Sequence, residues 1–258
     1  MPRFSGPLRI RNAHPLFIAS GAPEMLSASP ENSVSFVLTY GSTFLVQSSP
    51  AWAFAIDVET MVADLRLAKK LPWSVEASAR LPLVSHNSGF LDGLLDRFHT
   101  ATGLGDYGRS TRPHNAFLYE TRRDGRAVID GTPGEIEVGD IRLAMKKALA
   151  GPDPAVSLMA YVDLPTGDPD QGYGSGSLGA AAGVLMNKRL GRSVMAYLNA
   201  GFVYAGSLEA RQKVELADYP YGGAGLEWAW SERLAVNGQV LAHPSPFGRT
   251  GVDEMDDL

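Results

Sequence analysis

The sequence predicts an all-β protein, an antiparallel, up-and-down transmembrane β-barrel of about twelve strands with one short amphipathic helix in a loop. Three observations predict this fold class. Apolar and polar residues alternate with a period of two along most of the 258 residues. The alternating segments run to roughly 9 to 15 residues, which suits tilted strands that cross a bilayer. Tight turns and longer loops rich in Gly, Asp and Pro separate them, as at the two ends of an outer-membrane barrel.

The composition indicates a folded, turn-rich chain and excludes several classes of function. Hydrophobic residues make up 45% of the chain and charged residues only 20%, with Gly 28 and Pro 17. The net charge of -5 and the lack of a basic block disfavour nucleic-acid binding. Cys 0 excludes disulfides, thiol catalysis and cysteine metal sites. No window of about 18 consecutive apolar residues occurs, which excludes a transmembrane helix.

The two ends of the chain are expected to lie outside the strand order. Residues 1–32 are expected to form a Pro-rich N-terminal arm or plug, because their prolines leave no room for a long helix or a central strand. No secretory signal precedes it, which indicates a mature chain, a fragment or a cytosolic gene product. Residues 33–258 are expected to form the β-barrel domain. The prolines of the arm are Pro2, Pro7, Pro15, Pro23 and Pro30.

The count of strands and the C-terminus indicate a barrel that is incomplete in this chain. The acidic residues 253–258 lack the amphipathic strand and terminal aromatic residue that usually finish outer-membrane barrels. About eleven strands can be counted, an odd number where an even one is expected. We therefore expect either truncation at the C-terminus or a further short strand near residues 214–216.

The strands are justified in order by their alternation. Residues 34–40 place Val34, Phe36 and Leu38 on one face. Within residues 54–70 the apolar positions are first even and then odd, and this change of phase predicts a β-bulge near Thr60. The later alternating segments are 75–83, 141–145, 156–162, 178–186, 194–204 and 226–240.

The two faces of these strands differ in chemistry. If the aliphatic face meets lipid and the charged face lines a wet interior, seven residues become lumen-facing candidates. The alternative is a soluble barrel or sandwich with its apolar face inward, and period two alone does not choose between them. Strand length and small residues such as Gly179 and Gly183 opposite the apolar face favour the membrane barrel. The seven candidates are Asp64, Arg66, Glu76, Arg80, Asp140, Arg142 and Lys146.

Residues 89–103 break the period of two and are predicted to form the helix, with Ser88 as its cap and Gly103 at its end. Asp92, Asp96 and His99 share one polar face at i, i+4 and i+7. One interpretation is a proton relay, a metal site or a binding face. The other, which we prefer, is that these side chains tie the helix to arginines such as Arg80 or Arg97.

Aromatic residues are expected near the strand ends, where rings lie at the level of lipid headgroups. Aromatic packing inside an ordinary barrel accounts for the same pattern equally well. The residues concerned are Trp52, Trp73, Trp228, Trp230, Tyr204, Tyr219 and Tyr221.

The chain is predicted not to be an enzyme and to need no cofactor. The run Ser85-His86-Asn87-Ser88-Gly89 contains the residue types of a lipid hydrolase, but neighbours in sequence rarely face one another as a relay. No GxSxG or HExxH motif occurs, and no GxGxxG or GxxxxGK stretch follows a strand, so neither a metal site nor a nucleotide cofactor is expected.

Several motifs together resemble a known family. They are Phe4-Ser5-Gly6-Pro7-Leu8, Arg11-Asn12 and His14-Pro15-Leu16, then Gly89-Phe90-Leu91-Asp92-Gly93, Phe98-His99 and Gly103-Leu104, then Gly139-Asp140 and Leu164-Pro165-Thr166-Gly167-Asp168. On these residues the chain resembles an uncharacterised bacterial family, domain of unknown function 3187. The resemblance implies an exported protein of Gram-negative bacteria and an outer-membrane barrel, with no catalytic residues to carry over.

The expected function is a passive channel or a carrier for small molecules in the bacterial outer membrane, with outer-membrane lipids and a small solute as partners. Charges of both signs inside predict a hydrated lumen without strong ion selectivity, and about twelve strands leave a narrow pore. One alternative is an outer-membrane lipid-modifying hydrolase built around His86 or His99. The other is a soluble periplasmic β-barrel binding protein.

Overall fold

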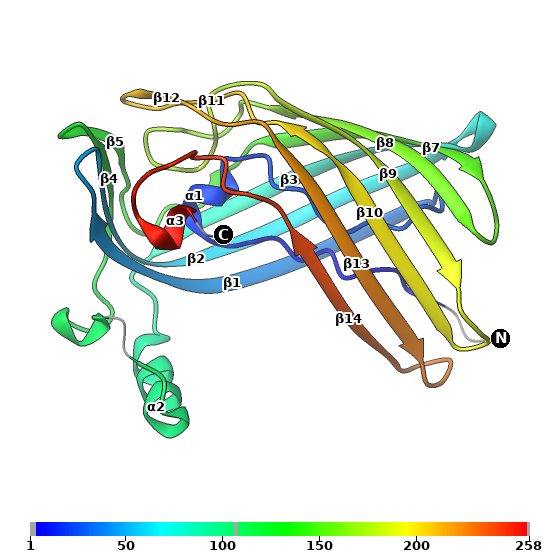
Figure 1. The fold of residues 1–258 in the computed structure, drawn as a ribbon, viewed down its shortest axis with the longest axis horizontal. Helices are drawn as coiled ribbons and strands as arrows, with labels where there is room; N and C mark the ends of the chain where they lie inside the picture. The colour runs from blue at the N-terminus through cyan, green and yellow to red at the C-terminus, as the bar shows by residue number, and fades with distance from the viewer. Residues whose placement is uncertain (1–3, 106–107, 257–258) are drawn as a thin grey trace.

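The computed structural model describes residues 4–105 and 108–256, and one large antiparallel sheet dominates it (Figure 1). Twelve strands belong to this sheet, which confirms the all-β antiparallel class, and two form a small separate sheet. The strands of the large sheet are β1 (Ser33–Ser48), β2 (Trp52–Leu71), β3 (Val75–Asn87), β4 (Leu118–Arg123), β5 (Arg126–Asp130), β6 (Glu137–Val138), β7 (Ile141–Ala150), β8 (Ala155–Leu164), β9 (Gly179–Arg189), β10 (Val194–Tyr204), β13 (Tyr219–Ala229) and β14 (Ala235–Ala242). The small sheet pairs β11 (Ser207–Glu209) with β12 (Lys213–Glu215). The helices are α1 (Pro15–Ile18), α2 (Asp92–Thr102) and α3 (Asp253–Asp256), with 3-10 turns η1 (Pro72–Ser74) and η2 (Arg109–Thr111).

Neighbours in the chain are mostly neighbours in the sheet. From one edge, β1 pairs with β2, β2 with β3, and the order continues through β7, β8, β9, β10 and β13 to β14. The hairpin of β4 and β5 extends the sheet beside the first residues of β2, and β6 pairs with β3. Within the described residues β1 and β14 each pair with one strand, so strand pairing does not close the sheet into a barrel. The predicted closure is therefore not seen at this seam.

The N-terminal segment lies in the seam between β1 and β14 (Figure 1). Leu8 exchanges two hydrogen bonds with the side chain of Gln239 on β14, at 2.8 and 2.7 Å. Arg9 donates to Ser35 Oγ on β1 at 2.8 Å. Leu8 is exposed and Arg11 is buried, so this segment continues the alternation of the strands on either side.

The two ends of the sheet differ in their connections (Figure 1). At one end, tight turns join β2 to β3, β7 to β8, β9 to β10 and β13 to β14, and we call it the tight-turn end. At the other, the long-loop end, the chain forms the longer connections 88–117, 165–178 and 205–218. The structure has a short strand near residues 214–216, as expected, but β12 belongs to the small sheet and adds nothing to the large one.

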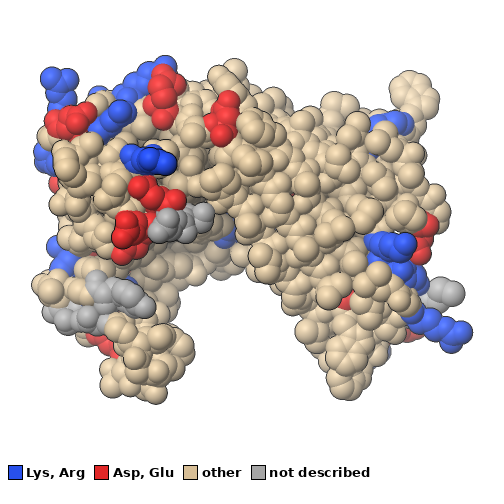
Figure 2. Space-filling model, in the orientation of Figure 1, with Lys and Arg blue, Asp and Glu red and all other residues tan. Residues whose placement is uncertain are grey.

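The apolar face of the large sheet points outward and the charged face points inward. Along β8, Leu158 and Val162 are exposed while the alternate residues Met159, Tyr161 and Asp163 are buried. Figure 2 shows the consequence on one face, where charged residues gather at the two ends of the long axis and other residues fill most of the region between them. The exposed outward residues include Val34, Phe36, Leu38, Leu65, Leu67, Leu143, Met145, Val184, Leu198, Phe202, Leu226, Val236 and Val240.

The bulge predicted near Thr60 is wrong. β1 and β2 pair without interruption from Ser33 with Ala68 to Ser48 with Ala53. The alternation keeps its phase, and what changes is the surroundings: Phe54 and Ile56 point into an apolar interior at the long-loop end, whereas Leu65 points outward nearer the tight-turn end. A change in the apolar positions therefore marks a boundary between two environments.

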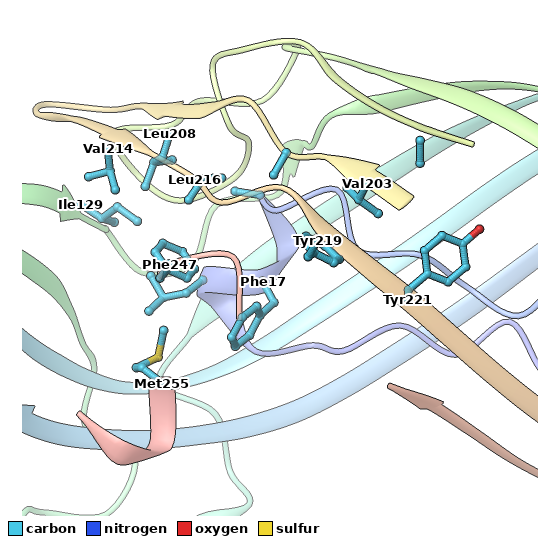
Figure 3. Packing of buried hydrophobic residues seen from close by; sticks show 14 of the residues in the cluster. Phe17, Ile129, Val203, Leu208, Val214, Leu216, Tyr219, Tyr221, Phe247 and Met255 are labelled. Atoms are coloured by element: carbon cyan, nitrogen blue, oxygen red, sulfur yellow. The ribbon is translucent and has the colours of Figure 1, made fainter. Parts of the chain in front are cut away.

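An apolar core fills the interior at the long-loop end (Figure 3). Its members come from both ends of the chain and from the strands, for example Phe17 of α1, Met255 of α3 and Tyr219 of β13. Phe17 and Phe247 meet edge to face with ring centroids 5.9 Å apart. This core occupies the interior at that end and packs α1 and α3 against the strands.

The predicted helix is present as α2, but it begins at Asp92 and Ser88 is not its cap. The residue before the helix is Leu91, and Oε1 of Glu59 on β2 accepts the backbone N–H groups of Phe90, at 2.9 Å, and Leu91. A carboxylate is favourable there because unpaired N–H groups and the helix dipole make a helix start positive. Gly103 ends the helix in the left-handed conformation as predicted.

The aromatic prediction holds for only part of its set. Trp73, Trp228, Trp230 and Tyr204 are exposed. The other three, Trp52, Tyr219 and Tyr221, are buried in the apolar core of the long-loop end, because this interior accepts rings.

Candidate functional site

Four adjacent strands place ionised side chains at one level of the interior. The register sets Arg66 of β2 opposite Arg80 of β3, Arg80 opposite Arg142 of β7, and Arg142 opposite Asp163 of β8. Directly opposite residues lie about 4.5–5.5 Å apart at Cβ. We call Arg66, Arg80 and Arg142 the arginine row, and all three are buried.

Two members of the arginine row have strong carboxylate partners. Arg142 donates from Nε and Nη2 to the two oxygens of Asp163, at 2.7 and 2.8 Å, the bidentate geometry that suits a guanidinium. Its guanidinium also lies 3.6 Å from the ring centre of Tyr161. Arg66 binds Glu76 at 2.7 Å, and Lys146 binds the other oxygen of Glu76 at 2.9 Å.

Arg80 is the least satisfied member of the row. Its Nε lies 3.5 Å from Asp64 Oδ1 without hydrogen-bond geometry, and Arg11 lies 3.9 Å from the same oxygen. Nε and Nη1 of Arg80 have no hydrogen-bond partner among the described residues. Such donors are costly to bury, which makes Arg80 the residue most in need of an anionic partner.

The N-terminal segment runs through the interior and is held by side chains of the strands. Asn199 accepts the N–H of Leu26 at 2.8 Å and donates to its carbonyl at 3.1 Å. Asn187 accepts the N–H of Ala28 at 3.0 Å and donates to Ser27 Oγ at 2.8 Å. Arg142, Lys146 and Tyr161 donate to further backbone carbonyls of residues 21–29.

The interior hollows are small. One, of about 20 Å³, is lined by Glu24 and the whole arginine row. Another, of about 10 Å³, lies beside Arg11, Arg80 and Asp163. Each holds roughly one water. A hollow of about 850 Å³ lies on the outer face between residues such as Val34 and Leu143.

Six of the seven lumen-facing candidates are buried, and Asp140 is only partly buried and lies apart from them. Its carboxylate accepts the N–H groups of Gly167 and Ser175 and the Ser175 hydroxyl, so it fixes the loop 165–178. Burial raises the pKa of Asp140 despite these hydrogen bonds. The alternation of apolar and charged residues along the strands was the sequence signal that identified these six residues.

Sequence reasoning missed the partners that the N-terminal segment brings. Glu24 and Arg11 are buried among the strand charges, and Asn187 and Asn199 hold the segment. The prolines dominated the interpretation of residues 1–32. Polar residues on the inward phase of otherwise apolar strands, as at Asn187 and Asn199, are the signal that could have found two of them.

The polar face of α2 is tied to the chain that follows the helix, in the manner we preferred but with other partners. Asp92 binds Nε of Arg109 at 3.0 Å and the N–H of Asn115 at 2.7 Å. Asp96 lies 2.6 Å from Nε2 of His114. His99 is the basic residue in the last turn of α2, and its carbonyl accepts the N–H of Leu104 at 3.1 Å. The structure does not bring this face to Arg80.

His86 lies on β3 at the long-loop end, past Leu83, the last exposed apolar residue of that strand. Its ring stacks on Tyr173 and meets the edge of Tyr119, both with centroids 5.0 Å away. Thr60 Oγ1 lies 3.1 Å from Nδ1 and the Gly172 carbonyl 3.4 Å from Nε2. Burial lowers the pKa of His86 to about 4, so the ring is neutral and fully enclosed.

In the part of the chain that the structure describes, no group of three or more His, Asp or Glu residues is placed to hold a metal ion. No helix in the same residues is long and apolar enough to cross a membrane.

Comparison with known proteins adds one finding. The family described as protein of unknown function (DUF3187) matches residues 3–248. A search of curated proteins found no match.

Proposed function

For this chain, which belongs to the DUF3187 family, we propose a function from its own geometry. It forms a barrel-like body in a bacterial outer membrane, and its N-terminal segment closes the interior. It passes a small solute, as a channel or carrier, when that segment moves.

The observation that carries the proposal is the sidedness of the large sheet. Residues such as Leu143, Leu198 and Val240 are exposed, while Arg66, Arg142 and Asp163 are buried on the opposite face. A soluble sheet protein does the reverse, because exposing apolar area to water costs roughly 25 cal/mol per Å². An outward apolar surface between charged ends suits hydrocarbon between two headgroup layers (Figure 2).

The seam between β1 and β14 is covered by the N-terminal segment. Leu8 and Gln239 satisfy one another there, and Arg9 reaches Ser35 on the other side. Through these side-chain contacts the segment covers two strand edges that would otherwise lie open.

The closure is held in a way that permits movement. Hydrogen bonds from Asn187 and Asn199 fix residues 26–28, and such bonds exchange with water at a net cost of only about 1 kcal/mol each. The hollows beside the segment are too small for a solute, so passage requires the segment to shift.

Conductance across planar bilayers tests the proposal. The double variant Asn187→Ala/Asn199→Ala removes these bonds and should show frequent conductance steps where the unaltered protein shows rare ones. Asn237→Ala is the matched control, because Asn237 has the inward phase of β14 and is separated from Asn187 by the two strands β10 and β13.

A pair of introduced cysteines gives a second test of the proposal, since the chain has Cys 0 and no other disulfide can form. Asn187 Nδ2 lies 2.8 Å from Ser27 Oγ, so Ser27→Cys/Asn187→Cys should lock the segment when oxidised and release it when reduced. Protein folded in bilayers that stays silent in every variant, reduced or oxidised, would contradict a transport role.

A further inference from the structure

The arginine row is an unusual arrangement for a protein interior. Arg66, Arg80 and Arg142 stand directly opposite one another on three adjacent strands. Like charges in such positions destabilise a sheet, and each buried ion costs several kcal/mol unless it is paired. The row therefore requires anionic partners.

The carboxylates of the strands are already committed. Asp163 is held by Arg142 through both oxygens, and Glu76 is shared by Arg66 and Lys146. Only Asp64 lies near Arg80, at 3.5 Å and without a hydrogen bond. Charges of both signs line the wall, and Asp64 Oδ1 also lacks a hydrogen bond, but most of the buried charged atoms without a partner among the described residues belong to arginines, including Nε and Nη1 of Arg80.

The remaining carboxylate belongs to the N-terminal segment. Glu24 is buried, and it lines the 20 Å³ hollow together with all three arginines. It is placed there by the same segment that we propose moves.

We infer that the arginine row is the binding site for the carboxylate or phosphate group of an anionic solute, and that Glu24 occupies this site in the closed state. This inference rests on the proposed function and names its substrate class. Guanidinium groups bind carboxylates and phosphates with matched donor geometry, and arginines lining a pore favour anions. The weak selectivity expected from mixed charges gives way to a preference for anions, because Arg80 keeps two donors without a partner among the described residues while Asp163 and Glu76 are each held by cations.

Chemical rescue tests the site without transport. Glu24→Ala removes the carboxylate and leaves its space, so sodium acetate, at constant ionic strength set with bulky sodium gluconate, should raise the unfolding temperature of this variant more than that of the unaltered protein. The gain should be lost in Glu24→Ala/Arg80→Gln and kept, though smaller, in Glu24→Ala/Arg80→Lys. Glu135→Ala, at an exposed loop residue, is the control. An equal effect of acetate on all proteins overturns the inference.

Ion selectivity supplies the second measurement. In the conducting Asn187→Ala/Asn199→Ala protein, the reversal potential in a potassium chloride gradient should lie nearer the equilibrium potential of chloride than that of potassium. Adding Arg80→Gln should move the reversal potential toward the equilibrium potential of potassium. A reversal potential nearer that of potassium in the double variant contradicts the anion site while leaving the proposed function standing. Absence of conductance together with acetate rescue contradicts only the proposed opening.

Discussion

At the scale of single residues, His86 shows how burial fixes a protonation state. Its ring is enclosed by Tyr119 and Tyr173, and its pKa falls from 6.5 to about 4. The folded protein therefore binds this proton less readily than the unfolded chain does.

We predict that the free energy of unfolding is unaffected by His86 above pH 6.5 and falls by up to about 3 kcal/mol as the pH drops from 6.5 to 4. The variant His86→Phe keeps an aromatic ring in the stack and should flatten this part of the profile. Urea unfolding in detergent micelles at several pH values measures it, and Thr60→Val serves as a control that lowers stability but retains the slope. Parallel profiles for His86→Phe and the unaltered protein would contradict the assignment.

Gly89 is required by its surroundings. Its φ is +66°, and an added Cβ would lie 1.8 Å from Cδ of Glu59, which is held by Tyr40 and by the start of the α2 segment. We predict that Gly89→Ala destabilises the protein by about 2 kcal/mol. Gly93→Ala, where nothing lies within 4 Å, should be neutral or stabilise by up to about 1 kcal/mol. Equal melting temperatures for the two variants would argue against this role of Gly89.

At the scale of elements, a buried ion pair between Asp92 and Arg109 holds α2 outside the sheet, together with Glu59 at the start of the helix. Asp92 and Arg109 are both buried, and Arg109 also donates to Ser42 Oγ of β1 at 2.7 Å. Leaving one member unpaired costs about 3–5 kcal/mol, whereas an exposed pair is worth under about 1 kcal/mol.

Asp92→Asn should therefore speed amide hydrogen exchange throughout α2 by orders of magnitude. Asp96→Asn should change it by less than about fivefold, because Asp96 and His114 are both partly exposed. Mass spectrometry of peptides from residues 88–105 reports both. Similar exchange rates in the two variants would show that the ion pair does not hold the helix.

Alternation of side chains was enough to predict the longer strands, because apolar and polar faces leave a pattern of period two along them. It missed the short strands β4, β5 and β6, which hold too few residues to show that pattern. Alternation also predicted a bulge at Thr60 that the structure does not have. The interior changes from charged to apolar along β2, and the amino-acid type of a residue does not show which surroundings it faces. The sequence predicted the helix α2 but could not reveal Glu59 as the acceptor at its start, because that contact joins residues far apart in the chain. The sequence identified the charged residues of the strands, but it did not show that three arginines form a row, because this depends on the register between neighbouring strands.

At the scale of the whole molecule, the sidedness was predictable and the seam was not. Asp64, Arg66 and Arg80 shared one face in the sequence and share the interior in the structure. Whether β1 meets β14 depends on strand tilt and on residues 8–11, whose alternation is too short to be noticed beside the prolines.

A substitution on the outer face tests the membrane position that the proposals share. Leu198 is exposed at the middle of β10, whereas Leu190 is exposed at a tight turn. Arginine at the midplane of a bilayer costs about 2–4 kcal/mol and near the interface about 0–1 kcal/mol. We predict that Leu198→Arg lowers the free energy of unfolding in phosphatidylcholine bilayers by the larger amount and Leu190→Arg by the smaller. In water an exposed position tolerates arginine, so two equal and negligible effects would place the outer face in solvent and remove the basis for transport.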